Sequence, residues 1–521
     1  MSSKKVFGKL VARQIIWCIA VVFLISVSVS VFFHKDYFPF LIAPLVIISI
    51  VALDSLQTKH TILKNYPFVG RLRYFFESVR PEFRQYFFEG ELDGKPFNRR
   101  QRSIVYQRAK NEKQTISFGM QDDPNRIGYE WATHSVYPKK ANKDHFRTTI
   151  GNKQCSQLYN ISIFNISAMS YGALSKTAVM SLNKGAALGN FAHNTGEGGI
   201  SEYHLQGGDL IWQIGTGYFG CRNEEGAFSE ELFAERANYQ QVKMIELKLS
   251  QGAKPGHGGL LPAEKNTAEI AKIRSIKPHT AVHSPAAHTA FTDAEGLMLF
   301  LAKLRKLSNG KPVGFKICIG RKDEFIEIVE AMFTTGIYPD FITIDGAEGG
   351  TGAAPLEFID YMGMALSDAI VFVNRTLTQF GIREHVKIMA SGKIISAFDI
   401  SKTMALGADA CYSARGMMFA LGCIQALQCD SGKCPVGIAT QNKSLYKGLD
   451  VTDKSVRITN FHKNTLKALA EFIGACGFTN PKEVKPDIFF RRTAHNSNQS
   501  FSEIYFSSPT QNSKKETINL N

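Results

Sequence analysis

Three cysteines late in the chain are close enough in sequence to bind one metal centre. The stretch GCIQALQCDSGKCPVGIAT places Cys423, Cys429 and Cys434 within twelve residues, and Pro435 follows the third. Nine cysteines among 521 residues do not indicate a disulfide framework, because such frameworks belong to short secreted chains. The spacing therefore indicates a metal or redox site. A zinc site would need a fourth ligand, such as Cys411 or a histidine, and plain buried thiols are the remaining alternative.

Polar, glycine-rich segments recur after apolar runs from about residue 155 onward. In chain order they read MSYGALS, TGEGG, QGAKPGHGG, DGAEGGTGA, SGKI and SARG. Glycine lets backbone N–H groups approach a ligand closely. One such loop indicates only a turn, whereas six on one face of a sheet indicate a cofactor or a phosphorylated ligand.

The segments that position these loops alternate between strand and helix. Short β-rich runs read YNISIFNISAM, KMIELKL, TAVHS, PVGFKICIG, DFITID, VKIMAS and ADACYSA, and helical patterns such as TDAEGLMLFLAKLRKLS separate them. This alternation predicts a parallel sheet. At least seven units over about 270 residues suit an α/β (β/α)8 TIM barrel, whose active-site loops follow the strands. An open doubly wound sheet is the alternative. SGKI and SARG stand where such barrels bind a phosphate.

Residues 1–56 predict a hairpin of two transmembrane helices. QIIWCIAVVFLISVSVSVFF provides 20 uncharged residues, and YFPFLIAPLVIISIVAL provides 17 more after the short break HKD. Lys4, Lys5 and Lys9 precede the pair, and further basic residues follow it. We therefore expect the inner (cytoplasmic) membrane, with the catalytic domain facing the cytoplasm. A signal peptide is one alternative, and a buried core helix in place of the second span is another.

The net charge of +15 is concentrated near the N-terminus. Residues 1–113 carry 18 Lys and Arg against 8 Asp and Glu, which is +10 of the total. No nucleic-acid-binding motif accompanies the excess, so we expect no nucleic-acid partner. Residues 57–150 form a basic, aromatic extension that packs on the barrel or on membrane lipid. We expect the barrel with its cysteine loop at 151–450, a helical segment at 451–505 and a disordered tail at 506–521.

Taken together, MSYGALS, TGEGG, QGAKPGHGG, DGAEGGTGA and CPVGIATQ resemble the signature of the synthase domain of the glutamate synthase family, over roughly residues 150–450. The resemblance implies a barrel that carries FMN, and a 3Fe-4S cluster held by Cys423, Cys429 and Cys434. It implies reductive amination of 2-oxoglutarate to glutamate, with electrons from a partner such as ferredoxin or a membrane carrier. The chain begins MSSKKV, without the family's amidotransferase domain and its N-terminal cysteine, so a short membrane-anchored form is expected.

The same resemblance implies the contacts to FMN. Lys316 of GFKI is similar to a strand lysine that lies beside the flavin ring, although a lysine snorkelling from the strand end is the alternative. Arg415 and its neighbours would hold the phosphate. The expected cofactor contacts are Ala168, Met169, Ser170, Lys248, Lys316, Asp345, Gly349, Gly350, Thr351, Gly392, Lys393, Ala414 and Arg415.

For the substrate, the resemblance points to Lys254 and Arg274, cations that suit the two carboxylates of 2-oxoglutarate. Gln251 and Asp293 complete the expected substrate contacts. Glu197 of TGEGG matches a glutamate close to the flavin and the substrate, so Glu197 and Lys254 are the expected catalytic residues. Capping of its own loop is the alternative role for Glu197.

The chain also departs from the family pattern. The family's KPGEGGQLPG is KPGHGGLLPA here, so His257 and Leu260 replace a glutamate and a substrate-binding glutamine. Where the family has a substrate-contacting serine, SPAAHTAFTD has Asp293. These changes should weaken dicarboxylate binding. Two other functions therefore stay open: the same flavin chemistry on a different amino or keto acid, and a membrane electron-transfer subunit.

Overall fold

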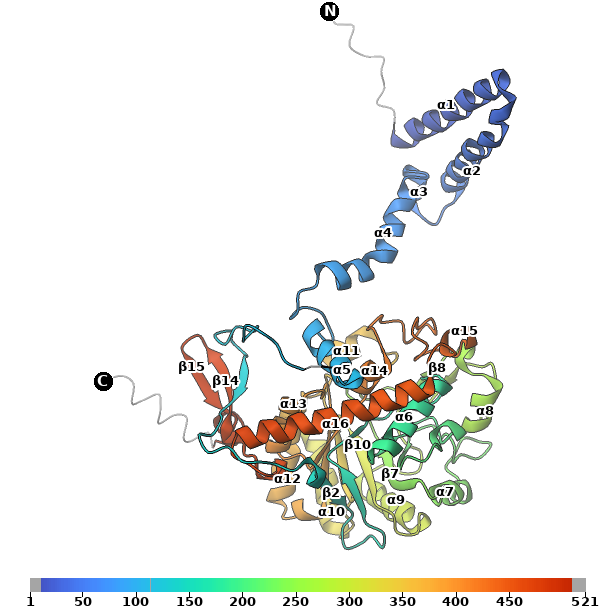
Figure 1. Ribbon diagram of the computed structural model, residues 1–521. Coiled ribbons are helices and arrows are strands. Elements are labelled where there is room, and N and C mark those ends of the chain that lie inside the picture. The colour runs from blue at the N-terminus through green and yellow to red at the C-terminus, as the bar shows by residue number, and fades with distance from the viewer. Residues whose placement is uncertain (1–10, 113, 508–521) are drawn as a thin grey trace, which may run out of the picture. The chain divides into compact units, whose positions relative to one another are not determined.

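The computed structural model describes residues 11–112 and 114–507, and the chain divides into two compact units, residues 1–99 and 100–521 (Figure 1). The basic residues Lys4, Lys5 and Lys9 lie outside the described residues. So does the tail predicted at 506–521, beyond Ser507.

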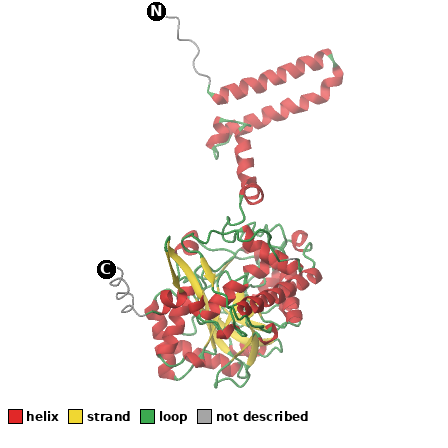
Figure 2. Ribbon diagram, turned by 60° about the vertical axis from the view of Figure 1, so that its left-hand side comes forward, coloured by secondary structure: helices red, strands yellow, loops and turns green. Residues whose placement is uncertain are grey.

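The first unit is built from helices alone within its described residues. Helix α1 spans Ala12–Phe33, and the 3-10 helix η1 (Lys35–Leu41) continues into α2 (Ile42–Leu56). Helices α1 and α2 lie side by side in both views (Figures 1 and 2). By length and composition, α1 and the continuous stretch Lys35–Leu56, which joins η1 and α2, could each cross a membrane. Only 22% of the second apolar window is buried, unlike the core helix of a soluble protein. Helices α3 (Thr61–Asn65) and α4 (Gly70–Phe83) and the π-helical turn η2 (Arg84–Phe88) complete the unit.

The second unit is a closed barrel of eight parallel strands within the described residues. Each strand pairs with the next along the chain, and β13 pairs with β4 to close the ring. This confirms the predicted (β/α)8 fold over the open sheet. The strands are β4 (Phe164–Ile166), β5 (His193–Asn194), β6 (Leu210–Ile214), β7 (Val242–Lys248), β10 (Val313–Ile317), β11 (Phe341–Asp345), β12 (Lys387–Ser391) and β13 (Ala410–Ser413).

Helices cover the outside of the barrel (Figure 2). Several of them start at a side-chain cap, for example α6 at Ser175, which accepts a hydrogen bond from the N–H of Ala178 at 3.3 Å. The described helices of this unit are α5 (Arg99–Lys110), α6 (Lys176–Gly189), α7 (Glu230–Ala237), α8 (Ala268–Arg274), α9 (Ala294–Leu307), α10 (Lys322–Thr335), α11 (Leu356–Tyr361), α12 (Leu366–Gln379), α13 (Ala397–Ala405), α14 (Arg415–Leu421), α15 (Lys443–Tyr446), α16 (Val451–Ala475) and α17 (Phe501–Phe506).

The long helix α16 lies in the helical segment expected at 451–505 and packs along α6 (Figure 1). Gly185 permits this close approach, because a Cβ there would lie 2.5 Å from the Cγ2 of Ile458. Thr459 Oγ1 also donates a hydrogen bond to the Gly185 carbonyl at 2.9 Å. The two helices therefore cover the first barrel strands as one layer.

Three small sheets lie outside the barrel among the described residues. One strand that was predicted for the barrel, TAVHS, belongs to one of them. TAVHS was expected in the barrel, but its strand β9 (Val282–His283) pairs antiparallel with β8 (Leu260–Leu261) in an insertion after β7. The other small strands are β1 (Glu130–Ala132), β2 (Arg147–Ile150), β3 (Tyr159–Ser162), β14 (Phe489–Ala494) and β15 (Ser497–Ser500).

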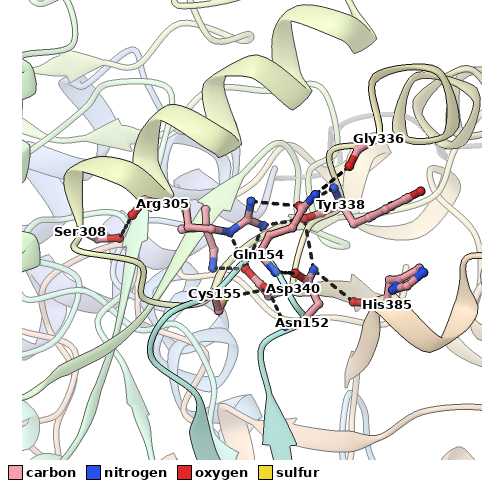
Figure 3. Close-up of polar contacts among 10 residues, drawn as sticks. Asn152, Gln154, Cys155, Arg305, Ser308, Gly336, Tyr338, Asp340 and His385 are labelled. Atoms are coloured by element: carbon pink, nitrogen blue, oxygen red, sulfur yellow. Dashed lines mark hydrogen bonds and ion pairs between the residues drawn. The ribbon is translucent and has the colours of Figure 1, made fainter.

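A buried polar cluster holds the hairpin between β2 and β3 against the amino-terminal end of the strands (Figure 3). Asp340, which directly precedes β11, accepts two hydrogen bonds from Arg305, at 3.1 Å from Nε and 2.9 Å from Nη2. The backbone N–H of Asn152 and the thiol of Cys155 also donate to Asp340, at 2.9 and 2.8 Å. This end of such barrels serves stability rather than catalysis.

Candidate active site

A cavity of about 490 Å³ lies at the carboxyl ends of the barrel strands, where the sequence predicts the site. Its size suits a small-molecule ligand. The expected site residues that line it are Ala168, Met169, Ser170, Glu197, Lys248, Gln251, Lys254, Arg274, Lys316, Asp345, Gly350, Thr351, Ala414 and Arg415.

A few expected residues lie outside the cavity wall. The Asp293 carboxylate accepts a hydrogen bond from the N–H of Gly296 at 2.7 Å and caps α9. An acidic side chain at this position satisfies a free helical N–H, and its contact to the substrate stays a prediction. Gly349, Gly392 and Lys393 also do not line the cavity, and the Lys393 side chain is exposed.

Glu197 and Lys248 form an ion pair inside the cavity. Lys248 Nζ lies 2.7 Å from Glu197 Oε1. Burial alone would raise the pKa of Glu197, but Lys248, Lys254 and Arg274 together hold that pKa below its ordinary value. Glu197 is therefore an ionised acceptor at neutral pH. Its hydrogen bond within the described residues comes from Lys248, which does not match the alternative of a loop cap.

Lys254 and Arg274 add two cations to the same cavity. Burial and the neighbouring Lys248 lower the pKa of Lys254, against an opposite pull from Glu197. Arg274 is buried, and burial lowers its pKa to about 10, so it stays charged at neutral pH. Its Nη2 donates to the Tyr171 carbonyl at 3.0 Å, whereas its buried Nε has no acceptor among the described residues. A buried donor without a partner is costly, so this guanidinium suits an anionic ligand.

Lys316 does not snorkel toward solvent. It is 6% exposed, and its Nζ lies 3.2 Å from Asp345 Oδ2. Burial would lower the pKa of Lys316, but Asp345, Glu246 and Glu197 raise that pKa instead. Asp345 also accepts a hydrogen bond from the N–H of Gly252 at 2.9 Å. The wall of the cavity thus holds a permanent cation in a fixed position.

Arg415 lies against Gly350 in another part of the wall. A Cβ on Gly350 would lie 2.7 Å from Arg415 Nε, so any larger residue would displace the guanidinium. Arg415 Nη2 donates to the Glu348 carbonyl at 2.6 Å. Burial lowers the pKa of Arg415 to about 10, and the residue remains a cation at neutral pH. A glycine loop beside a buried arginine is a suitable cradle for a phosphate.

A polar layer lies inside the barrel and reaches the cavity through Gln213, which the sequence patterns did not predict. Glu246 on β7 is fully buried and accepts hydrogen bonds from Asn194 Nδ2 and Gln213 Nε2, both at 2.7 Å, and from Thr343 Oγ1 at 2.5 Å. The signal available in the sequence was a polar residue inside the apolar runs IWQI and MIEL. Barrel interiors usually carry branched apolar residues, so this layer extends the polar site inward.

The three cysteines of the late loop interact electrostatically. Burial, together with the nearby Cys429 and Cys434, raises the pKa of Cys423 to about 12. The N–H of Gln425 points at Cys423 Sγ at 3.4 Å, and Lys265 Nζ donates to the Cys429 carbonyl at 2.7 Å. Across residues 11–112 and 114–507, no three His, Cys, Asp or Glu side chains converge on one point that a single metal ion would occupy. A three-iron cluster would not require the three thiols to converge on one point, because each iron would take one thiolate.

Known proteins resemble this chain over most of its length. A family profile described as a conserved region in glutamate synthase matches residues 101–479. The glutamate synthase large subunit-like protein YerD of Bacillus subtilis is 37% identical over 470 residues, which cover 82% of this chain and 89% of that relative. The archaeal glutamate synthase (NADPH) of Methanocaldococcus jannaschii is 34% identical over 364 residues, 70% of this chain and 67% of the relative. The flavin-binding domain of baker's yeast flavocytochrome b2 aligns with a TM-score of 0.41 and 11% identity, over 85% of this chain and 90% of that one.

Proposed function

Because the chain belongs to the glutamate synthase family of oxidoreductases, we propose that it uses FMN to aminate a 2-oxo acid reductively, with 2-oxoglutarate as the first candidate substrate. The observation that carries the proposal is the charge of the cavity. Six basic side chains line it against three acidic ones, so the site favours an anionic cofactor and an anionic substrate. The basic residues are Lys248, Lys254, Lys265, Arg274, Lys316 and Arg415.

The residues present fit FMN. The cradle of Gly350 beside Arg415 would receive its phosphate, since a side chain at Gly350 would displace the guanidinium. Lys316 would hold a positive charge beside the ring, kept protonated by Asp345. When bound, FMN would supply the hydride for the reduction.

The substrate would lie between Arg274 and Lys254, two cations that can donate hydrogen bonds to its carboxylates. Arg274, with its unpartnered Nε, would bind one carboxylate, and Lys254 would bind the other. Glu197 is ionised and close to Lys248, so the pair would take up and return a proton at the reacting nitrogen. These roles for Glu197, Lys254 and Arg274 are part of the proposal.

Cys423, Cys429 and Cys434 would hold a 3Fe-4S cluster, supported by their close spacing in the sequence and the N–H directed at Cys423. Such a cluster would supply a route for electrons from a partner. We propose ferredoxin or a membrane carrier as that partner. We also propose a membrane position, supported by the two apolar stretches of the first unit, with the catalytic unit on the cytoplasmic side.

The test uses the full-length protein, solubilised and purified without oxygen. The protein is first reduced, then 2-oxoglutarate and ammonium are added, and flavin absorbance and glutamate are measured together. Reoxidation with formation of glutamate supports the proposal. A flavin that stays reduced with every 2-oxo acid, but passes electrons to a membrane fraction, would instead identify a membrane electron-transfer subunit.

One observation favours a second candidate, the same chemistry on another 2-oxo acid. Leu260 lines the cavity where the family has a substrate-binding glutamine, and its side chain offers no hydrogen bond. A substrate with an apolar tail would meet this leucine without leaving a polar group unpaired. Comparing aliphatic 2-oxo acids with 2-oxoglutarate, in the wild type and in Leu260→Gln, separates the two candidates.

A further inference from the structure

The end of the first unit presents an exposed aromatic face. Phe75 and Phe76 on α4 are 58% and 60% exposed, Phe83 is 50% exposed, and Phe87 on η2 is 75% exposed. Leu72, at 55%, lies among them. At 100° per residue, the four positions on α4 fall in one arc about 100° wide. A soluble surface rarely leaves an apolar patch of this kind uncovered.

Arginines border this face. By the same helical period, Arg73 and Arg80 follow the edge of the apolar arc, and Glu77 falls beyond them on the opposite side. Neither arginine has an ion-pair partner among residues 11–112 and 114–507, and both are exposed. Long basic side chains beside an apolar stripe can reach toward lipid phosphates while their stems cover hydrocarbon.

The start of α4 is tied to the end of the second apolar helix. Asp54 on α2 is 1% exposed and accepts a hydrogen bond from the N–H of Phe68 at 2.9 Å. The guanidinium of Arg71 binds the same carboxylate twice, at 2.9 and 2.6 Å. An apolar helix of this length would end at a membrane surface, so the contact brings α4 to that surface.

We propose that α4 and η2 lie in the headgroup layer of an anionic membrane, with the phenylalanines toward the acyl chains and the arginines at the phosphates. The inference depends on the proposed membrane hairpin and adds a second, charge-selective attachment to it. Lipid is favoured over a protein partner because unpaired arginines border the aromatic face and because the face begins where an apolar helix ends.

The experiment places tryptophan on the two faces of α4 in the full-length protein. Phe76→Trp probes the aromatic face, and Glu77→Trp is the matched control on the polar side. Each variant is reconstituted in phosphatidylcholine vesicles, with or without phosphatidylglycerol and with or without bromine on the acyl chains. Emission is compared with that of the parent protein, which contains three tryptophans.

We expect brominated lipid to quench the emission of Phe76→Trp but not that of Glu77→Trp. Phosphatidylglycerol should strengthen the quenching, and Arg73→Gln with Arg80→Gln should remove that gain. Salt at about 0.5 M should also remove it, because it screens the attraction of exposed charges. Equal quenching at both positions, or none at either, would overturn the inference. A blue-shifted but unquenched Phe76→Trp would also overturn it and would indicate a protein partner or a second copy.

Trp17 separates failure of this inference from failure of its premise. Trp17 lies on α1, and its Nε1 donates to Ser55 Oγ at 3.1 Å. Quenching of the parent protein that disappears in Trp17→Phe reports insertion of the hairpin. If this signal is present and Phe76→Trp is unquenched, only the surface helix is wrong. If this signal is absent, the hairpin and the surface helix both fail, whereas the flavin chemistry is unaffected.

Discussion

Lys248 Nζ lies 2.7 Å from Oε1 of Glu197, and this ion pair is enclosed with Lys254 and Arg274 in one cavity. Glu197 lies just after β5, and Lys248 is the last residue of β7, some fifty residues later in the sequence. The barrel brings these two strand ends together. Cations outnumber acids in the cavity wall, and Glu197 is the carboxylate that Lys248, Lys254 and Arg274 all act on. Neutralising Glu197 would therefore leave these three cations without a shared counter-charge.

Glu197→Gln should destabilise the protein at neutral pH and flatten its stability in acid. The pKa of folded Glu197 lies below its ordinary 4.5, because Lys248, Lys254 and Arg274 outweigh burial. Its stabilisation is therefore present above about pH 4.5 and is lost as the pH falls through the lower folded pKa. We expect a loss of about 2 kcal/mol at pH 7, as for a hydrogen bond between charged groups. Denaturant unfolding between pH 3 and pH 7 measures it.

The matched control for this prediction is Glu224→Gln, which alters an exposed glutamate that does not line the cavity. It should leave both the stability at pH 7 and the acid slope unchanged. If Glu197→Gln has the same acid slope as the wild type, Glu197 does not carry the low pKa and the ion pair is not formed in solution.

Arg274→Met should raise the KM for the 2-oxo acid more than it lowers kcat, the rate of flavin reoxidation at saturating substrate. The guanidinium carbon of Arg274 lies 5.1 Å from the centre of the Phe219 ring, and this contact holds the side chain in place without a ligand. Its buried Nε has no acceptor among the described residues and is available to a ligand. Truncating one partner of a buried charge pair costs about 2–5 kcal/mol, so we expect KM to rise at least about tenfold.

Arg274→Lys tests whether the planar fork matters as well as the charge. Lysine keeps the charge but loses the second donor, so recovery should be partial. KM is measured by the rate of flavin reoxidation over a range of 2-oxo acid concentrations. An unchanged KM in Arg274→Met would remove Arg274 from the substrate site.

Gly350→Ala should lose the cofactor while the barrel stays folded. A Cβ at Gly350 would lie 2.7 Å from Arg415 Nε, whereas a Cβ at Gly352 would meet nothing within 4 Å. Gly352→Ala, two residues along the same loop, is thus the control and should retain FMN. The ratio of flavin to protein after purification and the circular dichroism spectrum give the result. Equal flavin content in both variants would show that the cradle does not hold the phosphate.

Strand patterns predicted the barrel well where apolar runs are long, as in DFITID and VKIMAS, which become β11 and β12. They missed β6 (Leu210–Ile214), although four of its five buried residues are apolar. They also missed β5, because only His193 and Asn194 form its ladder and neither is apolar. Hydrophobic periodicity cannot detect a strand of two polar residues that is buried by its neighbours.

The candidate site followed from loop positions, because loops after parallel strands must meet at one end of a barrel. Lys316 and Asp345 were both expected beside the ligand, but their mutual ion pair depends on strand register and could not be read from sequence. Asp293 shows another limit of the sequence. The family resemblance suggested a ligand contact for it, but did not reveal that its side chain caps α9.

Asp340→Ala should be strongly destabilising without being a site mutation. Its carboxylate accepts five hydrogen bonds, two from Arg305 and one each from Asn152, Cys155 and the N–H of Val313 (Figure 3). Removing it leaves the Arg305 cation buried and unpaired, which costs about 3–5 kcal/mol. Asp323→Ala breaks an exposed ion pair with Arg321 and should have no measurable effect, because solvent screens that pair. Urea unfolding of both variants decides the matter, and equal midpoints would show that the network at this end of the barrel does not hold the hairpin.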